Sequence, residues 1–342
     1  KDSTMYKENG KLVVVPEENG TVMDVEKTAA AVEAVLFTQT SGEADVVVTE
    51  AEPEITAEML SSVTDLIGSF YTTYNNADAN RNTNLRVGCE NLNGSIIMPG
   101  EVFSVTEALG PQTYANGYRS AGVYVNGKVE SGMGGGVCQI STTVYNAVIM
   151  AELEIVERFP HSMTVGYVPL GRDAAIADNY KDFQFRNNTD TPIYLEAYAA
   201  NNKLVINLYG KEIHDPGRTV EYETVYEATI PKPAEIVTED PELPEGTREV
   251  TYTGKTGCKV SVYKKVYQDG ALVSREWFNS SSYRATADEV TVGTKKADTA
   301  GTTENTTNTS ENTITTDPSV TDQTGQDGTQ IPEGLPVPET TE

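Results

Sequence analysis

The sequence contains very little histidine and cysteine. Two histidines, His161 and His214, and three cysteines, Cys89, Cys138 and Cys258, occur in 342 residues. An odd number of cysteines gives no disulfide framework and leaves at least one thiol free. No run of about 18 apolar residues occurs, so the sequence predicts no membrane-spanning helix. Chemistry that needs a thiol and an imidazole is therefore confined to these five positions.

Positive charge is also scarce. Lysine and arginine number 25 against 51 acidic residues, for a formal net charge of −26. Nucleic-acid binding requires a basic surface, so we expect no nucleic-acid partner. Such acidity suits a secreted or wall-associated protein. Because the sequence begins at Lys1 with no signal peptide, we expect a targeting segment or membrane anchor to precede it.

The glycine-rich stretch 132–136 leads into apolar residues at helical spacing, which predicts a helix with one buried face. These apolar residues are Ile140, Val144, Ala147, Val148 and Ala151. Cys138 then lies at the helix N-terminus, where unpaired N–H groups and the helix dipole favour a thiolate. The alternative is a cysteine that packs as a small hydrophobic residue.

His161 follows this helix, and the next residues, 163–168, have the composition of a strand. A cysteine at a helix N-terminus and a histidine on a following strand form the layout of papain-like and NlpC-type enzymes. Such enzymes need a group that orients the imidazole, and Asp173 is the first candidate, with Asp178 the second. The alternative is a surface histidine in a turn.

The segment around Cys138 resembles the VanW family, which is named from vancomycin-resistance clusters. The resemblance covers roughly residues 80–210 and rests on four stretches: MPGEVFSVTEALGPQTYANGY, GMGGGVCQISTTVYNA, ERFPHS and GRDAAIADNYKDFQFRNNTDTPIYLEA. It implies peptidoglycan L,D-transpeptidation, a cysteine-dependent acyl transfer. Residue by residue, it implies that Cys138 is the nucleophile and that His161 is the matching histidine.

Several neighbours of the catalytic candidates could line a substrate site. We expect these to be Gly135, Gly136, Gln139, Ser141 and Arg158. Backbone N–H groups at Cys138 and in the glycine loop are candidate oxyanion donors. Arg158 could pair with a stem-peptide carboxylate, or form a structural ion pair. This chemistry requires no metal and no cofactor.

We expect four segments with a central α+β fold. Residues 1–52 resemble part of a peptidoglycan-binding domain, or form a spacer, and residues 53–215 form the VanW-like module. Residues 216–296 resemble the G-five domain, an elongated all-β module that serves either wall adhesion or spacing. Residues 297–342 lack basic, aromatic and cysteine residues, which predicts a disordered acidic tail.

Two segments carry ambiguous local signals. Thr56 can cap a helix in the segment 55–74, with a looser strand from Phe70 onward. The acidic, proline-rich residues 231–244 indicate a joint between strands.

Three functional hypotheses follow for an extracellular, wall- or membrane-associated protein of a Gram-positive bacterium. The first is an L,D-transpeptidase that acts on peptidoglycan stem peptides and links their third residues. The second is a cysteine peptidase or amidase on the same polymer. The third is a non-catalytic wall-binding protein in which Cys138 only packs. A membrane contact is expected only through an N-terminal anchor.

Overall fold

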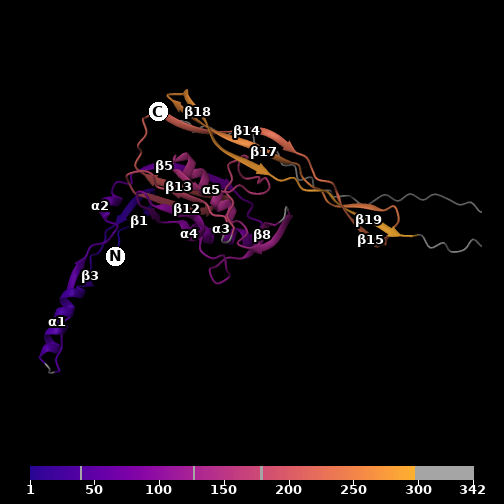
Figure 1. Ribbon diagram of the computed structural model, residues 1–342. Coiled ribbons are helices and arrows are strands. Elements are labelled where there is room, and N and C mark those ends of the chain that lie inside the picture. The colour runs from indigo at the N-terminus through magenta and orange to yellow at the C-terminus, as the bar shows by residue number, and fades with distance from the viewer. Residues whose placement is uncertain (39–40, 126–127, 178–179, 297–342) are drawn as a thin grey trace, which may run out of the picture. The chain divides into compact units, whose positions relative to one another are not determined.

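Strands predominate over helices in the computed structural model, which describes residues 1–38, 41–125, 128–177 and 180–296 (Figure 1). Asp178 and the predicted acidic tail 297–342 lie outside the described residues. The central segment combines helices with antiparallel strands, as predicted for an α+β module.

Two small hairpin-like units begin the chain. Strands β1 (Thr4–Glu8) and β2 (Lys11–Val15) form an antiparallel hairpin, and β3 (Gly20–Met23) pairs with β4 (Val48–Ala51). Helix α1 (Val25–Phe37) lies between β3 and β4 in the sequence, and Asp24 caps it by accepting a hydrogen bond from the Lys27 N–H. No residue of α1 is buried.

A four-stranded antiparallel sheet supports the central segment. Its order is β5 (Asp65–Thr73), β13 (Lys203–Gly210), β12 (Ile193–Ala200) and β6 (Ser95–Ile97). Helix α5 (Val137–Met150) packs along β5 and β13, while α3 (Ala79–Leu92) packs on β12 (Figure 1). The sheet therefore fixes both helices relative to one another.

Smaller elements complete this segment. A three-stranded sheet has the order β10 (Glu154–Glu157), β11 (Gln184–Arg186) and β7 (Val102–Ser104). Strands β8 (Ser120–Val125) and β9 (Lys128–Met133) form an antiparallel hairpin. Two short helices are α2 (Ala57–Leu60) and α4 (Val105–Leu109).

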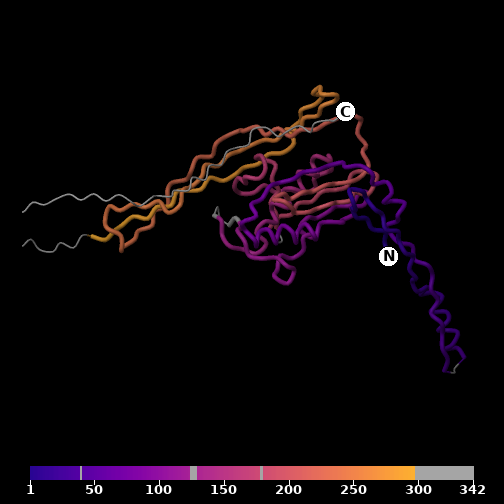
Figure 2. Tube along the Cα trace, turned by 180° about the vertical axis from the view of Figure 1, so that it is seen from behind, coloured from indigo at the N-terminus to yellow at the C-terminus, as the bar shows by residue number. Residues whose placement is uncertain are grey.

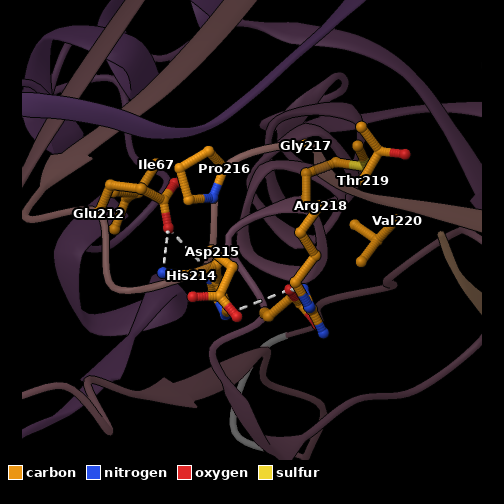
Figure 3. Close-up of a pocket in the computed structure, with 11 residues that line it drawn as sticks. Ile67, Glu212, His214, Asp215, Pro216, Gly217, Arg218, Thr219 and Val220 are labelled. Atoms are coloured by element: carbon orange, nitrogen blue, oxygen red, sulfur yellow. Dashed lines mark hydrogen bonds and ion pairs between the residues drawn. The ribbon is translucent and has the colours of Figure 1, made fainter. Parts of the chain in front are cut away.

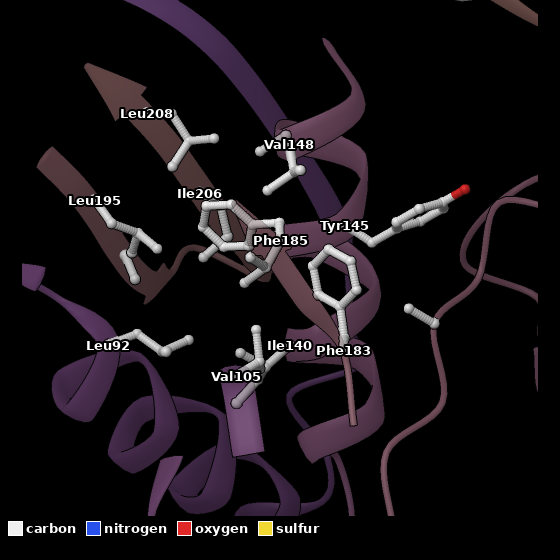
Figure 4. Packing of buried hydrophobic residues seen from close by; sticks show 14 of the residues in the cluster. Leu92, Val105, Ile140, Tyr145, Val148, Phe183, Phe185, Leu195, Ile206 and Leu208 are labelled. Carbon is white, nitrogen blue, oxygen red and sulfur yellow. The ribbon is translucent and has the colours of Figure 1, made fainter. Parts of the chain in front are cut away.

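The core lies between α5 and the two sheets. Ile140 and Val148 extend from α5 toward Phe185 and the sheet residues, whereas the Tyr145 ring lies beside Phe183 and points away from Leu195 and Leu208 (Figure 4). All are almost fully buried, and the rings of Tyr145 and Phe183 are nearly perpendicular, with 5.4 Å between their centroids. This packing holds the N-terminal end of α5 in a fixed place.

The helix expected after Thr56 is only the single turn α2, and residues 65–73 form strand β5, which begins before the strand expected from Phe70. Gly68 provides the physical reason. A Cβ atom there would lie 2.4 Å from the Ala147 carbonyl oxygen of α5, so glycine allows the helix to lie directly on the strand. Packing against α5 and pairing with β13 therefore determine the secondary structure of this segment.

Residues 218–295 are all-β, as predicted. Long strands β14 (Arg218–Ile230), β17 (Gly257–Gln268) and β18 (Ala271–Tyr283) run antiparallel beside one another (Figure 2). A second sheet has the order β15 (Ile236–Pro244), β19 (Glu289–Lys295) and β16 (Arg248–Tyr252). The proline-rich joint expected at 231–244 was therefore wrong in part, because most of it is β15, which pairs in parallel with β19.

Candidate active site

A tight glycine loop precedes helix α5. Gly134 and Gly136 have φ values of +71° and +118°, a region that strongly favours glycine. The Val137 N–H donates to the Gly134 carbonyl, which closes the turn into the helix. Cys138 is therefore the second residue of α5.

Gly135 is held by its neighbours on both sides. A Cβ atom at this position would lie 2.6 Å from the Gly122 carbonyl oxygen of β8. From α3, the Asn84 side-chain amide donates to the Gly135 carbonyl at 2.9 Å. The loop is thus fixed by backbone contact and by one buried amide.

The Cys138 thiol is partly buried and donates to the Ile176 carbonyl at 3.2 Å. Burial raises the pKa of this thiol, but the neighbouring His161, the Ile176 backbone and the Lys181 charge together outweigh burial, so the net pKa lies below its ordinary value. A lowered pKa increases the thiolate fraction, which is the nucleophilic form.

His161 lies in a loop. The strand expected at 163–168 was wrong, because these residues pair with no neighbouring strand. Their alternating apolar residues, Met163 and Val165, are instead buried within the loop. The loop returns to Asp173 below α5, where Thr142 accepts a hydrogen bond from the Ala174 N–H.

Asp173 holds His161 through two hydrogen bonds. Its Oδ2 accepts from the His161 backbone N–H at 2.6 Å and contacts the ring Nδ1 at 2.7 Å. Burial lowers the pKa of His161, but Asp173 and the Cys138 thiolate outweigh burial and raise the pKa to about 9. Burial likewise raises the pKa of Asp173, while His161 and the Arg158 charge lower it by more. Asp173 therefore remains a carboxylate that stabilises an imidazolium.

The second ring nitrogen, His161 Nε2, is buried and makes no hydrogen bond to the described residues. Cys138 and His161 nevertheless each shift the pKa of the other. Together with Asp173, they can form a thiolate–imidazolium pair oriented by a carboxylate.

Comparison with known proteins finds two domain models that match parts of the chain. Residues 80–209 match the family model described as VanW like protein, and residues 220–295 match the G5 domain model. The chain contains a VanW-like domain followed by a G5 domain. The peptidoglycan-binding domain expected at residues 1–52 is not shown by these matches and stays a prediction.

Two curated relatives match part of the chain. Uncharacterized protein YoaR of Bacillus subtilis (strain 168) is 35% identical over 162 residues, which are 47% of this chain and 54% of YoaR. Vancomycin B-type resistance protein VanW of Enterococcus faecalis (strain ATCC 700802 / V583) is 28% identical over 131 residues, 37% of this chain and 48% of that protein. The chain thus spans about half the length of these relatives.

Two solved G5 structures are also similar in sequence. The IgA1 protease G5 domain is 32% identical and covers 24% of this chain and 96% of its own, with a TM-score of 0.18. The HP0197 G5 structure is 28% identical, and the match covers 22% of this chain and 97% of the HP0197 chain, with a TM-score of 0.15. Scores this low carry no structural argument.

Two other residues predicted to line the site, Gln139 and Ser141, are buried. Gln139 is buried, accepts from Arg81 at 2.7 Å, and donates to Thr72 and to the Thr73 carbonyl. Ser141 is also buried, and its hydroxyl has no hydrogen-bond partner among the described residues. Gln139 therefore offers a ligand no free polar atom.

Arg158 forms a buried ion pair with Asp173, with Nη2 to Oδ1 at 3.3 Å. It also donates to the Asp173 and Gly171 carbonyls and to Ser281. These contacts match the expected alternative of a structural ion pair, in place of pairing with a stem-peptide carboxylate.

Tyr283 is the site neighbour that sequence reasoning missed. This G5-domain residue donates its hydroxyl hydrogen bond to Asp173 Oδ1 at 2.5 Å. No local motif marks it, because the contact joins residues 110 positions apart.

A cavity of about 440 Å³ lies away from these residues, at the start of β14 (Figure 3). Its lining includes Glu152, His214 and Arg218 but none of Cys138, His161 and Asp173. Glu152 is paired there with Arg218 and contacts His214 Nε2 at 3.3 Å. The cavity is therefore bordered by an ion-pair cluster outside the candidate active site.

Within the described residues, no helix has the length and hydropathy needed to cross a membrane.

Proposed function

We propose that the VanW-like domain is a cysteine-dependent L,D-transpeptidase that acts on peptidoglycan stem peptides. The observation that carries the proposal is the Cys138–His161–Asp173 set, in which the thiol pKa is lowered and the imidazole pKa is raised to about 9. A cysteine that only packs in an apolar site would have a raised pKa instead, as burial produces at Cys89.

The first half-reaction forms an acyl-enzyme. The Cys138 thiolate attacks the carbonyl carbon of the third stem residue, and the bond to the terminal D-alanine nitrogen breaks. The His161 imidazolium gives its proton to that leaving amine, so the site becomes a thioester and a neutral imidazole.

The second half-reaction transfers the acyl group. A side-chain amine of a neighbouring stem attacks the thioester, and neutral His161 takes the proton that the amine loses. The C–S bond breaks, which restores the thiolate and the imidazolium. The product is a link between the third residues of two stems.

The loop before α5 supplies the candidate oxyanion donors. Cys138 lies in the first turn of α5, where N–H groups have no acceptor from a preceding turn of the helix. The Val137 and Gln139 N–H groups donate to the Gly134 and Gly136 carbonyls, so the Cys138 N–H is the candidate from this turn. The fixed positions of Gly134–Gly136 keep these donors oriented before substrate binds, which is what makes such donors effective.

The domain composition supports a place at the cell wall. A VanW-like domain stands beside a G5 domain, and one relative carries the name of a vancomycin B-type resistance protein. The relatives come from Bacillus subtilis and Enterococcus faecalis, which supports a Gram-positive source. In this proposal the G5 domain keeps the enzyme at its polymeric substrate.

The test uses purified protein and disaccharide tetrapeptide stems, with products measured by mass spectrometry. Wild-type protein should release D-alanine and yield dimers linked between third residues. Cys138→Ala should abolish both products, and Cys138→Ser should be nearly inactive because a serine hydroxyl is far less ionised at this site.

The matched control is the double variant Cys89→Ser with Cys258→Ser. Both thiols are buried, and burial raises the pKa of Cys89 to about 12, so neither should contribute to acyl transfer. This variant should lose stability but keep both products. Monomeric tripeptides without dimers would instead identify a hydrolase, and no products from folded protein would favour wall binding alone.

A further inference from the structure

The end of strand β18 reaches into the VanW-like domain. Tyr283 is 1% exposed, and its hydroxyl accepts a hydrogen bond from the Gly171 N–H at 2.7 Å while donating to Asp173 Oδ1 at 2.5 Å. Tyr283 belongs to the residues matched by the G5 domain model. One buried side chain therefore joins the G5 domain to the carboxylate that orients His161.

The same sheet contacts the loop that carries His161 and Asp173 at several further points. The Arg284 N–H donates to the Ser162 carbonyl at 2.7 Å, directly after His161. Thr224 of β14 donates to the Leu170 carbonyl at 2.7 Å. Ser281 accepts from Arg158, the ion-pair partner of Asp173, at 3.0 Å. The loop is thus held by the G5 domain on one side and by α5 on the other.

Asp173 divides its two oxygens between two tasks. Oδ2 is occupied by the backbone and ring nitrogens of His161. Oδ1 meets Arg158 at 3.3 Å and Tyr283 at 2.5 Å, so the shorter contact is with the tyrosine. Without that hydroxyl, the carboxylate would keep one longer contact on Oδ1, and the Gly171 N–H would lose its acceptor.

We propose that Tyr283 is a positioning residue for the Cys138–His161–Asp173 site, so that the G5 domain completes the active site of the VanW-like domain. This inference rests on the proposed function. It adds that the G5 domain takes part in the geometry of the reaction in addition to any role in adhesion.

The consequence concerns thiolate formation. A carboxylate that can rotate stabilises the imidazolium less, and a weaker imidazolium stabilises the Cys138 thiolate less. Loss of the Tyr283 hydroxyl should therefore move thiol ionisation to higher pH. A tyrosine that only packs between the domains would leave this ionisation unchanged.

Tyr222 provides a matched control. It comes from β14, and its hydroxyl donates to the Ile149 carbonyl of α5 at 2.7 Å. It therefore joins the same two domains through a tyrosine hydroxyl but contacts neither His161 nor Asp173. Tyr222→Phe and Tyr283→Phe each remove one hydroxyl and keep the ring.

The experiment measures alkylation of Cys138 by iodoacetamide as a function of pH in the full chain, with peptide mass spectrometry to separate the three cysteines. Tyr283→Phe should move the midpoint up by at least half a pH unit, and Tyr222→Phe should match the wild type. In turnover, Tyr283→Phe should lower kcat roughly 10- to 100-fold with little change in KM. Equal midpoints for the two folded variants would overturn the proposal.

A second measurement leaves the hydroxyl in place, in case Tyr283→Phe does not fold. A protein with 3-fluorotyrosine at position 283 should give a fluorine resonance that titrates with His161, near pH 9, and the same label at 222 should not. A flat response at 283 would contradict the inference. Absence of D-alanine release by the wild type would refute the proposed function but not the positioning role of Tyr283. The alkylation midpoint and the fluorine titration both test that role without turnover.

Discussion

At the residue scale, Cys138 and His161 show burial and charge acting in opposite directions. Burial alone would keep the thiol and the imidazole neutral, yet the pKa of Cys138 is lowered and that of His161 is raised to about 9. The thiolate–imidazolium pair is favoured over the neutral pair because Asp173 supplies a buried negative charge next to the imidazole. The pair titrates as a unit, so its two apparent pKa values belong to both residues.

The resulting prediction is a bell-shaped pH dependence of acyl-enzyme formation. As the thiolate forms, the rate should rise with pH, at pH values below the ordinary cysteine pKa of about 8.5. At higher pH the rate should fall, because His161 loses its proton near pH 9. Single-turnover release of D-alanine between pH 5 and pH 10 measures both limbs. His161→Gln should shift thiol ionisation up to the ordinary range. A wild-type profile with one ordinary thiol ionisation would contradict the ion pair.

At the element scale, the N-terminus of α5 depends on how closely its loop approaches β8. Gly135→Ala would place a Cβ atom 2.6 Å from the Gly122 carbonyl and 2.8 Å from the Ala121 carbonyl carbon. Backbone atoms cannot rotate away, so the loop must move, at a cost of about 1–3 kcal/mol. Thermal unfolding should show that loss, together with a larger loss of acylation rate.

Gly166→Ala is the control for that variant. Gly166 is exposed, and an added Cβ atom would meet nothing within 4 Å. This variant should keep stability within about 0.5 kcal/mol of the wild type. Equal effects of the two alanines would show that the loop tolerates displacement.

Local patterns predicted several elements but not the contacts that join them. Helical periodicity and the glycine loop predicted α5, and Thr56 acts as the predicted cap of α2. Strand β15 was missed because its partner β19 lies some fifty residues later, and no local signal reports such pairing. Tyr283 was missed for the same reason. Non-local contacts therefore mark the limit of what this sequence could predict.

At the scale of the whole molecule, Glu152 links the VanW-like domain to the start of the G5 domain. Its side chain is 9% exposed and pairs with Arg218 and Lys264. Glu152→Gln would leave these cations without their counter-charge, so we expect a stability loss of roughly 1–3 kcal/mol in denaturant unfolding.

The control is Glu223→Gln. Glu223 also pairs with two cations, Lys265 and Arg275, but its side chain is 35% exposed. Exposed pairs contribute about 0–1 kcal/mol, so this variant should stay close to the wild type. A larger loss of stability in Glu223→Gln than in Glu152→Gln would contradict the expectation that the more buried ion pair contributes more.

The parallel pairing of β15 and β19 has a mechanical consequence. The chain enters this sheet at Ile236, the first residue of β15, and leaves it at Lys295, the last residue of β19. Tension applied between those two points pulls parallel neighbours in opposite directions, so it loads their hydrogen bonds in shear, all together. An antiparallel hairpin pulled at its open end instead separates one bond at a time. The module should therefore resist tension between these two residues until the whole row of hydrogen bonds breaks.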